Sequence, residues 1–122
     1  MTSATILVVE DDASAQDLYE VLLDIEGCEV VRAIDGDEAL KEIQSLIPQL
    51  VILDLMMTNL DGEEVLRQMK MDSRLARIPV IVVTGKSEAI ERLEEQLGKE
   101  NVFAKPFHPT KFLDRVTDLL GL

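Results

Sequence analysis

Side chains that handle phosphate and metal ions follow the apolar runs of this sequence. Glu10, Asp11 and Asp12 follow residues 6–9, Asp54 follows residues 50–53, Thr84 follows residues 80–83, and Lys105 follows residues 102–104. If the runs are adjacent parallel strands, these side chains converge, because function in open sheets gathers at the carboxyl ends of the strands. The expected site therefore combines carboxylates, a hydroxyl and an ammonium group.

Such a site suits Mg²⁺ and phosphoryl transfer. Carboxylates brought close together repel one another, and Mg²⁺ is a hard ion that prefers carboxylate, water and phosphate oxygens. An ionised carboxylate is also a competent nucleophile towards phosphorus. Attack by Asp54 would give an acyl phosphate whose charge is spread over oxygens held by Mg²⁺, Lys105 and Thr84. We therefore predict that Asp54 accepts a phosphoryl group and that this modification switches the conformation of the domain. The protein would then be a signalling domain rather than a turnover enzyme.

Taken singly, these residues have simpler structural roles. We expect Asp12 to cap the following helix, as acidic residues after a strand commonly do. Thr84 alone could end a strand, and Lys105 alone could be a solvated end residue. Their occurrence together, at matched strand ends, favours the shared site.

The elements that position these residues alternate along the chain. Five predicted strands cover residues 6–9, 28–33, 50–53, 80–83 and 102–104. The apolar positions at helical spacing between and after them are Leu18, Leu22 and Ile25; Leu40, Ile43 and Ile47; Val65, Leu66 and Met69; Ile90, Leu93 and Leu97; and Phe112, Leu113, Val116, Leu119 and Leu120. Strict alternation of strands and helices predicts a single α/β domain, residues 1–122, built as a three-layer sandwich around a parallel sheet.

Helix boundaries have their own signals. Asp35 with Glu38 and Asp61 with Glu64 have capping-box spacing, ahead of two of the helical stripes. Gly27 marks a helix end, and Pro109 opens the last helix.

The composition of the chain argues against several kinds of binding partner and site. There are 24 acidic against 12 basic residues, a net charge of −12, so direct binding to nucleic acid or a membrane is not expected. Cys28 is the single cysteine, so an intramolecular disulfide and a thiolate metal cluster are excluded. The sequence shows neither a signal peptide nor a membrane-spanning apolar run, so we expect a cytoplasmic protein.

Four motifs follow one another along nearly the whole chain: Ile6-Leu7-Val8-Val9-Glu10-Asp11, Leu53-Asp54-Leu55-Met56-Met57 followed by Leu60-Asp61-Gly62, Ile78-Pro79-Val80-Ile81-Val82-Val83-Thr84-Gly85, and Ala104-Lys105-Pro106-Phe107. In this order they resemble the motifs of the response-regulator receiver domain (CheY-like) of two-component signalling systems. The resemblance implies a flavodoxin-like sheet with strand order 2-1-3-4-5.

The resemblance also implies a role for each matching residue. Asp54 is then the phosphoacceptor. Asp11 binds Mg²⁺ directly with Glu10 acting nearby, and the Met56 backbone carbonyl completes the protein ligands. Lys105 and Thr84 contact the phosphoryl group, Gly85 leaves room for the donor, and Pro106 follows a cis peptide bond. The implied donor is a phosphohistidine on a sensor histidine kinase or a histidine phosphotransfer protein. The downstream effector is unknown.

Three positions depart from the family's usual pattern. Thr58 stands where proline is common, and Lys86 occupies a variable position that we expect to affect the lifetime of the phosphate. Val102 stands where an aromatic side chain usually reports the switch, and the neighbouring Phe103 faces the opposite side of the sheet.

Two other classes of function compete with a phosphorylation switch. A constitutive interaction scaffold is favoured by Val102 but disfavoured by the full set of site residues. An aspartyl phosphatase would need a second carboxylate two residues after the nucleophile, where this chain has Met56, and a cap over the substrate. A flavin site is weaker still, because the first loop is acidic where a phosphate cradle is glycine-rich or hydroxyl-rich.

Overall fold

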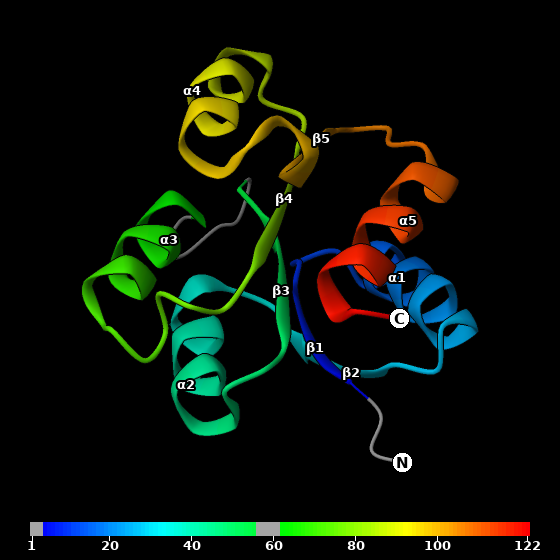
Figure 1. Ribbon diagram of the computed structural model, residues 1–122, viewed down its shortest axis with the longest axis horizontal. Helices are drawn as coiled ribbons and strands as arrows, with labels where there is room; N and C mark the ends of the chain where they lie inside the picture. The colour runs from blue at the N-terminus through cyan, green and yellow to red at the C-terminus, as the bar shows by residue number, and fades with distance from the viewer. Residues whose placement is uncertain (1–3, 56–61) are drawn as a thin grey trace.

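The computed structural model describes residues 4–55 and 62–122, which form one parallel sheet covered by helices on both faces (Figure 1). The strands are β1 Thr5–Val9, β2 Glu29–Ala33, β3 Leu50–Asp54, β4 Val80–Thr84 and β5 Val102–Ala104. The helices are α1 Ala13–Ile25, α2 Gly36–Leu46, α3 Gly62–Met71, α4 Ser87–Leu97 and α5 Pro109–Leu120, with a 3₁₀ turn at Lys99–Asn101. The sheet has the order β2-β1-β3-β4-β5, and all four pairings are parallel, so the predicted fold class and strand order are confirmed.

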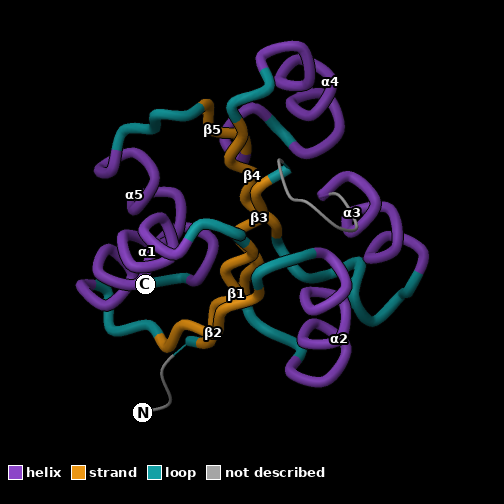
Figure 2. The backbone as a smooth tube through the Cα atoms, turned by 180° about the vertical axis from the view of Figure 1, so that it is seen from behind, coloured by secondary structure: helices purple, strands orange, loops and turns teal. Residues whose placement is uncertain are grey.

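The helices divide into two layers. Helices α1 and α5 lie on one face of the sheet, and α2, α3 and α4 lie on the other (Figures 1 and 2). Strands β1, β3 and β4 are therefore covered on both faces, which explains why their sequences are continuously apolar rather than alternating.

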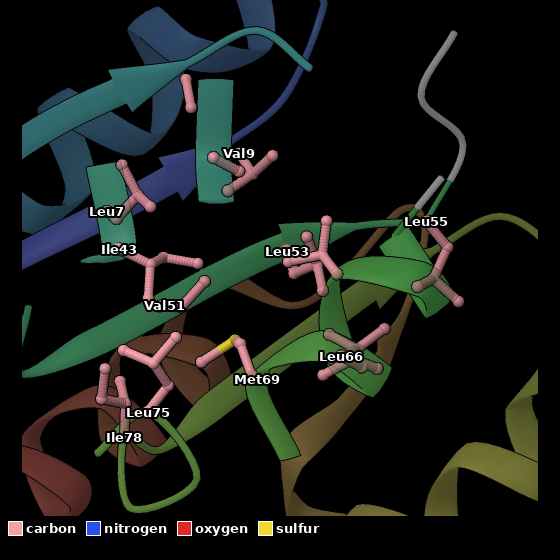
Figure 3. Close-up of a cluster of buried hydrophobic side chains, with 14 of the residues drawn as sticks. Leu7, Val9, Ile43, Val51, Leu53, Leu55, Leu66, Met69, Leu75 and Ile78 are labelled. Atoms are coloured by element: carbon pink, nitrogen blue, oxygen red, sulfur yellow. The ribbon is translucent and has the colours of Figure 1, made fainter. Parts of the chain in front are cut away.

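Two hydrophobic clusters hold the layers together. On the side of α2, α3 and α4, Leu7, Val51 and Leu53 of the sheet pack with Ile43 and Met69 (Figure 3). The cluster on the other side is built around Phe112, which is fully buried. Alternate residues of the same strand thus enter opposite clusters, as the two-residue period of a strand requires.

The predicted helix signals are present among the described residues. The Asp12 carboxylate caps α1 by accepting from the Ala15 backbone N–H at 2.9 Å, and Asp35 caps α2 in the same way. Gly27 has a φ of +73° just after α1, and Pro109 is the first residue of α5. Asp61, the predicted cap of α3, lies outside the described residues. None of the described helices is long and apolar enough to cross a bilayer.

The apolar stripe predicted for the first helix is wrong. Leu18 and Ile25 are exposed, and α1 instead buries Gln16, Tyr19 and Leu23. Apolar residues are so dense in this helix that two faces fit the helical period, and the face that carries Tyr19 is the one that meets α5. The second predicted stripe also ends early, because Ile47 leaves the helix in a left-handed conformation and is largely exposed.

Candidate functional site

Strand register brings the predicted site residues to one edge of the sheet. In β1 and β3, Val9 pairs with Leu53, so Glu10 and Asp54 follow at neighbouring positions. In β4 and β5, Thr84 pairs with Ala104, so Lys105 follows directly after a residue that pairs with Thr84. This is the carboxyl edge of the sheet, where the sequence predicted the site.

The Lys105 ammonium group lies between two buried carboxylates. Its Nζ atom is 2.8 Å from Asp54 Oδ2 and 3.0 Å from Glu10 Oε1. The side chains of Asp54 and Glu10 are 3% and 2% exposed, whereas that of Lys105 is 34% exposed. Lys105 thus reaches in from the solvent side and partly neutralises two acids that the strand ends hold inside the protein.

A third carboxylate completes an acidic cluster. Oxygen atoms of Glu10, Asp11 and Asp54 all lie within 4.8 Å of one another, and Asp11 is the exposed member. Hard divalent cations take oxygen ligands, and Mg²⁺ in particular is commonly held by one or two protein carboxylates together with water and phosphate. The donor set of this cluster therefore fits Mg²⁺. The backbone carbonyl of Met56, the fourth predicted ligand, lies outside the described residues.

The ionisation of the cluster shows that it is short of positive charge. The pKa of Glu10 is raised to about 7, because burial and the hydrogen bond with Asp54 outweigh the opposing effect of Lys105. Burial lowers the pKa of Lys105, but its hydrogen bonds to Asp54 and Glu10 outweigh that effect, so the net shift is upward. One ammonium group thus contacts two of the three clustered carboxylates, and a bound cation would relieve the repulsion among all three.

Thr84 is fully buried at the end of β4, one strand away from Asp54. Its Oγ1 atom accepts a hydrogen bond from the Lys86 backbone N–H at 2.9 Å. The hydroxyl proton is not used in that bond, so Thr84 retains a donor for a further acceptor.

The segment after Lys105 is fixed by aromatic packing. The Lys105–Pro106 peptide bond is cis, the geometry that the resemblance implied. Beyond it, the Phe107 ring lies 4.9 Å from that of Phe112 and 5.7 Å from that of Tyr19, measured between ring centroids. These contacts tie the loop that carries Lys105 to α1 and α5.

The two residues at the start of β5 face opposite sides of the sheet. Val102 enters the cluster under α4, whereas Phe103 packs edge-on against Phe112 on the other side, with the ring centroids 5.8 Å apart. Phe103 therefore does not replace an aromatic side chain at position 102.

Sequence reasoning missed Gln16 as a positioning residue. Its buried Nε2 atom lies 3.0, 3.0 and 3.1 Å from the backbone carbonyl oxygens of Val8, Glu10 and Ala33, which share its two donor hydrogens. It thereby joins the ends of β1 and β2 at the point where Glu10 leaves the sheet. The available signal was an uncharged polar residue one helical turn before Tyr19, seven residues after the first strand.

Gly62 sets the distance between α3 and the strand that ends in Asp54. A Cβ atom at this position would lie 2.8 Å from the Asp54 carbonyl oxygen and 2.9 Å from the Leu55 Cα atom. Both contacts are to backbone, which cannot move aside as a flexible side chain can. Glycine therefore allows the first turn of α3 to approach the chain directly after Asp54.

Comparisons with known proteins agree with this geometry. A family model described as the response regulator receiver domain matches residues 6–117. A solved structure of a putative response regulator from Chloroflexus aurantiacus superposes with a TM-score of 0.87 at 27% identity and covers 99% of this chain and 100% of that one.

Two curated relatives extend the comparison. PhoP, the alkaline phosphatase synthesis transcriptional regulatory protein of Bacillus subtilis, is 36% identical over 94% of this chain and 48% of its own length. A probable transcriptional regulator of Cyanophora paradoxa is 39% identical over 94% of this chain and 47% of its own length. The chain thus spans about half the length of the curated relatives it matches.

Proposed function

The chain belongs to the response regulator receiver-domain family of two-component systems, and we propose that it accepts a phosphoryl group on Asp54 in a Mg²⁺-dependent reaction. The observation that carries the proposal is the contact of Lys105 with Asp54 at 2.8 Å, inside a cluster of three carboxylates. A structural ion pair needs neither the third carboxylate nor the buried hydroxyl of Thr84 beside it.

The proposed donor is a phosphohistidine on a sensor histidine kinase or a histidine phosphotransfer protein. A carboxylate oxygen of Asp54 attacks the phosphorus atom, the bond from phosphorus to the imidazole nitrogen breaks, and the released imidazole takes up a proton. The acyl phosphate that results is later hydrolysed by water, which returns Asp54 and inorganic phosphate. The protein contributes mainly position and charge, as is usual for phosphoryl transfer.

The neighbouring residues have separate tasks in this reaction. Glu10, Asp11 and Asp54 would hold Mg²⁺, with the Met56 carbonyl as a further ligand, and the ion would neutralise the charge that develops on the phosphoryl oxygens. Lys105, which now donates to Asp54, would donate to a phosphoryl oxygen instead. The salt bridge between Lys105 and Asp54 supports this proposed role of Lys105.

Thr84 would couple the phosphate to the rest of the domain. Its hydroxyl accepts from Lys86 and can still donate, so a phosphoryl oxygen on Asp54 would draw it towards that strand. Movement of Thr84 would favour one of two pre-existing arrangements of the fourth helix and the fifth strand and helix. The output of the switch would be a partner or an output domain. We do not expect this acidic domain to bind nucleic acid itself.

Intact mass spectrometry tests the proposal. The protein is incubated with acetyl phosphate in the presence or absence of Mg²⁺, alongside Asp54→Asn and the control Asp24→Asn, which removes an exposed carboxylate outside the site. We expect the wild type and Asp24→Asn to gain the mass of one phosphoryl group with Mg²⁺ and Asp54→Asn to gain none. A gain by Asp54→Asn equal to that of the wild type would refute the assignment.

Val102 supports one other candidate, a scaffold that binds partners without phosphorylation. Such a scaffold has no reason to keep an ion site, so Mg²⁺ titration separates the two. Saturable Mg²⁺ binding that requires Asp11 supports the switch, and its absence supports the scaffold.

A further inference from the structure

A second concave region lies at the opposite edge of the sheet from Asp54. It is a hollow of about 250 Å³ between the carboxyl ends of α3 and α4, next to Val80, the first residue of β4. Met69, Leu97 and Ile78 contribute apolar walls, while Lys70 and Arg77 stand at its rim. The site proposed above uses the other end of β4, at Thr84, so the two regions share no residue.

Away from the hollow, an ion pair joins the first turn of α3 to α4. Glu63, in the first turn of α3, accepts a hydrogen bond from Arg92 of α4 at 2.6 Å. Towards their carboxyl ends, the described side chains leave the space between Met69 and Leu97 open. The loop from α3 to β4 closes the bottom of this space with Ile78.

The charge at the rim is unlike that of the rest of the protein. The chain carries 12 basic residues, and four of them, Arg67, Lys70, Arg74 and Arg77, lie within residues 67–77, where Asp72 is the single acid. Arg67 pairs with Glu64, and Arg74 lies 3.7 Å from Asp72. Lys70 and Arg77, the two that border the hollow, form no ion pair with any residue in the described ranges 4–55 and 62–122. Two exposed cations thus flank a partly apolar hollow on a protein whose net charge is −12.

A second hollow adjoins the first and shares Arg77 with it. It is lined by Ile47, Ser73, Arg74 and Arg77 and has a volume of about 410 Å³. Ile47 is 43% exposed there because its left-handed conformation carries it out of α2. A ligand that spans both hollows would therefore contact apolar side chains of the first hollow and Ile47 of the second. Arg77 would lie between these contacts.

From these features we propose that this surface docks an acidic peptide segment of a partner protein, which inserts one aliphatic or aromatic side chain between α3 and α4. The size of the first hollow selects this occupant, because about 250 Å³ is below the roughly 300–1,000 Å³ of sites for drug-sized ligands. The unpaired Lys70 and Arg77 select acidic neighbours for the anchor residue, since complementary charge steers association. The proposal goes beyond phosphoacceptance, and the site can be filled whether or not Asp54 is phosphorylated.

The test uses a peptide of sequence Asp-Glu-Leu-Glu-Asp and the nitrogen-15-labelled protein at low salt. Control peptides carry serine in place of the leucine, or lysine in place of the acids. The double variant Lys70→Glu with Arg77→Glu removes the cationic rim, and Lys41→Glu with Lys111→Glu makes the same change in net charge at exposed lysines elsewhere. Backbone amide shifts locate the peptide, and titration gives its dissociation constant.

We expect the largest amide shifts at residues around the hollow, weaker binding of both control peptides, and unchanged binding by Asp54→Asn. Reversing the charges of Lys70 and Arg77 should weaken peptide binding ~tenfold. Reversing Lys41 and Lys111 should weaken it less than ~twofold, because exposed charges that do not contact the peptide contribute little to its affinity. Equal weakening by the two double variants, or shifts scattered over the surface, would overturn the proposal. Shifts at the same residues on concentrating the protein alone would assign the surface to a second copy of the chain and would also overturn it.

Discussion

Asp11 differs from the other two carboxylates of the cluster because it is exposed and Lys105 does not contact it. Replacing it with asparagine should leave the fold intact, with a change in the free energy of unfolding within ~0.5 kcal/mol. Affinity for Mg²⁺ should fall at least ~tenfold, because a full negative charge next to the ion is lost. Calorimetric titration measures the affinity, and Asp24→Asn is the matched control. Equal Mg²⁺ affinity in the two variants would remove Asp11 from the site.

Lys105 should have two roles: it stabilises the folded state, and it would contact the proposed phosphoryl group. Lys105→Met leaves Glu10 and Asp54 buried without their cation, and breaking such a pair commonly costs about 3–5 kcal/mol. The partial exposure of Lys105 places the expected loss in the lower part of that range. Urea unfolding without Mg²⁺ measures it, and added Mg²⁺ should restore part of the loss. A variant as stable as the wild type in the absence of Mg²⁺ would contradict this account of the cluster.

The sequence predicted which residues form the site better than it predicted the residues that hold them in place. Glu10, Asp11, Asp54 and Lys105 follow strands, and parallel strands bring their ends together, so these residues were identifiable by position. Their roles in catalysis stay predictions. Gln16 was missed because its importance lies in three bonds to backbone carbonyls of two strands, and no spacing rule connects a helix side chain to those carbonyls.

Among the elements, α3 approaches the end of β3 closely because residue 62 is a glycine. Gly62→Ala would put a methyl group 2.8 Å from the Asp54 carbonyl oxygen, so either α3 or the chain after Asp54 must shift. We expect a loss of about 1–3 kcal/mol in unfolding free energy, as for other overpacked positions, together with slower phosphorylation by acetyl phosphate.

Gly27→Ala is the control for this prediction. Gly27 has a positive φ, but a methyl group added there would meet no atom of the described residues within 4 Å. The substitution should cost about 1–2 kcal/mol through backbone strain and leave the phosphorylation rate unchanged. If Gly62→Ala phosphorylated at the wild-type rate, the close approach of α3 would have no bearing on the site.

Strands were predicted more accurately than helix faces. Residues 50–53 and 80–83 are short, uninterrupted apolar runs rich in β-branched residues, as expected for strands covered on both faces. In α1, by contrast, Leu18, Tyr19, Leu22 and Leu23 fit two overlapping stripes, and the packing of Tyr19 against Phe112 decides between them. That contact joins residues far apart in the chain, so local periodicity could not reveal it.

For the whole molecule, the net charge of −12 and the acidic cluster predict that Mg²⁺ stabilises the folded state. A ligand that binds the folded state alone contributes about 2.7 kcal/mol at one hundred times its Kd. We therefore expect the Tm to rise with MgCl₂ well beyond the rise produced by NaCl at equal ionic strength. Asp11→Asn should abolish most of the difference between the two salts. If both salts raised the Tm equally, the effect would be general screening and not a site.

The central claim is that Asp54 carries the phosphoryl group, and chemical trapping tests it most directly. Borohydride reduces an aspartyl phosphate to homoserine, which peptide mass spectrometry locates in the sequence. After incubation with a phosphodonor and Mg²⁺, we predict homoserine at position 54 and at no other acidic residue, and none when Mg²⁺ is omitted. Homoserine at position 11, or protein that gains a phosphoryl group without yielding homoserine at position 54, would contradict the account.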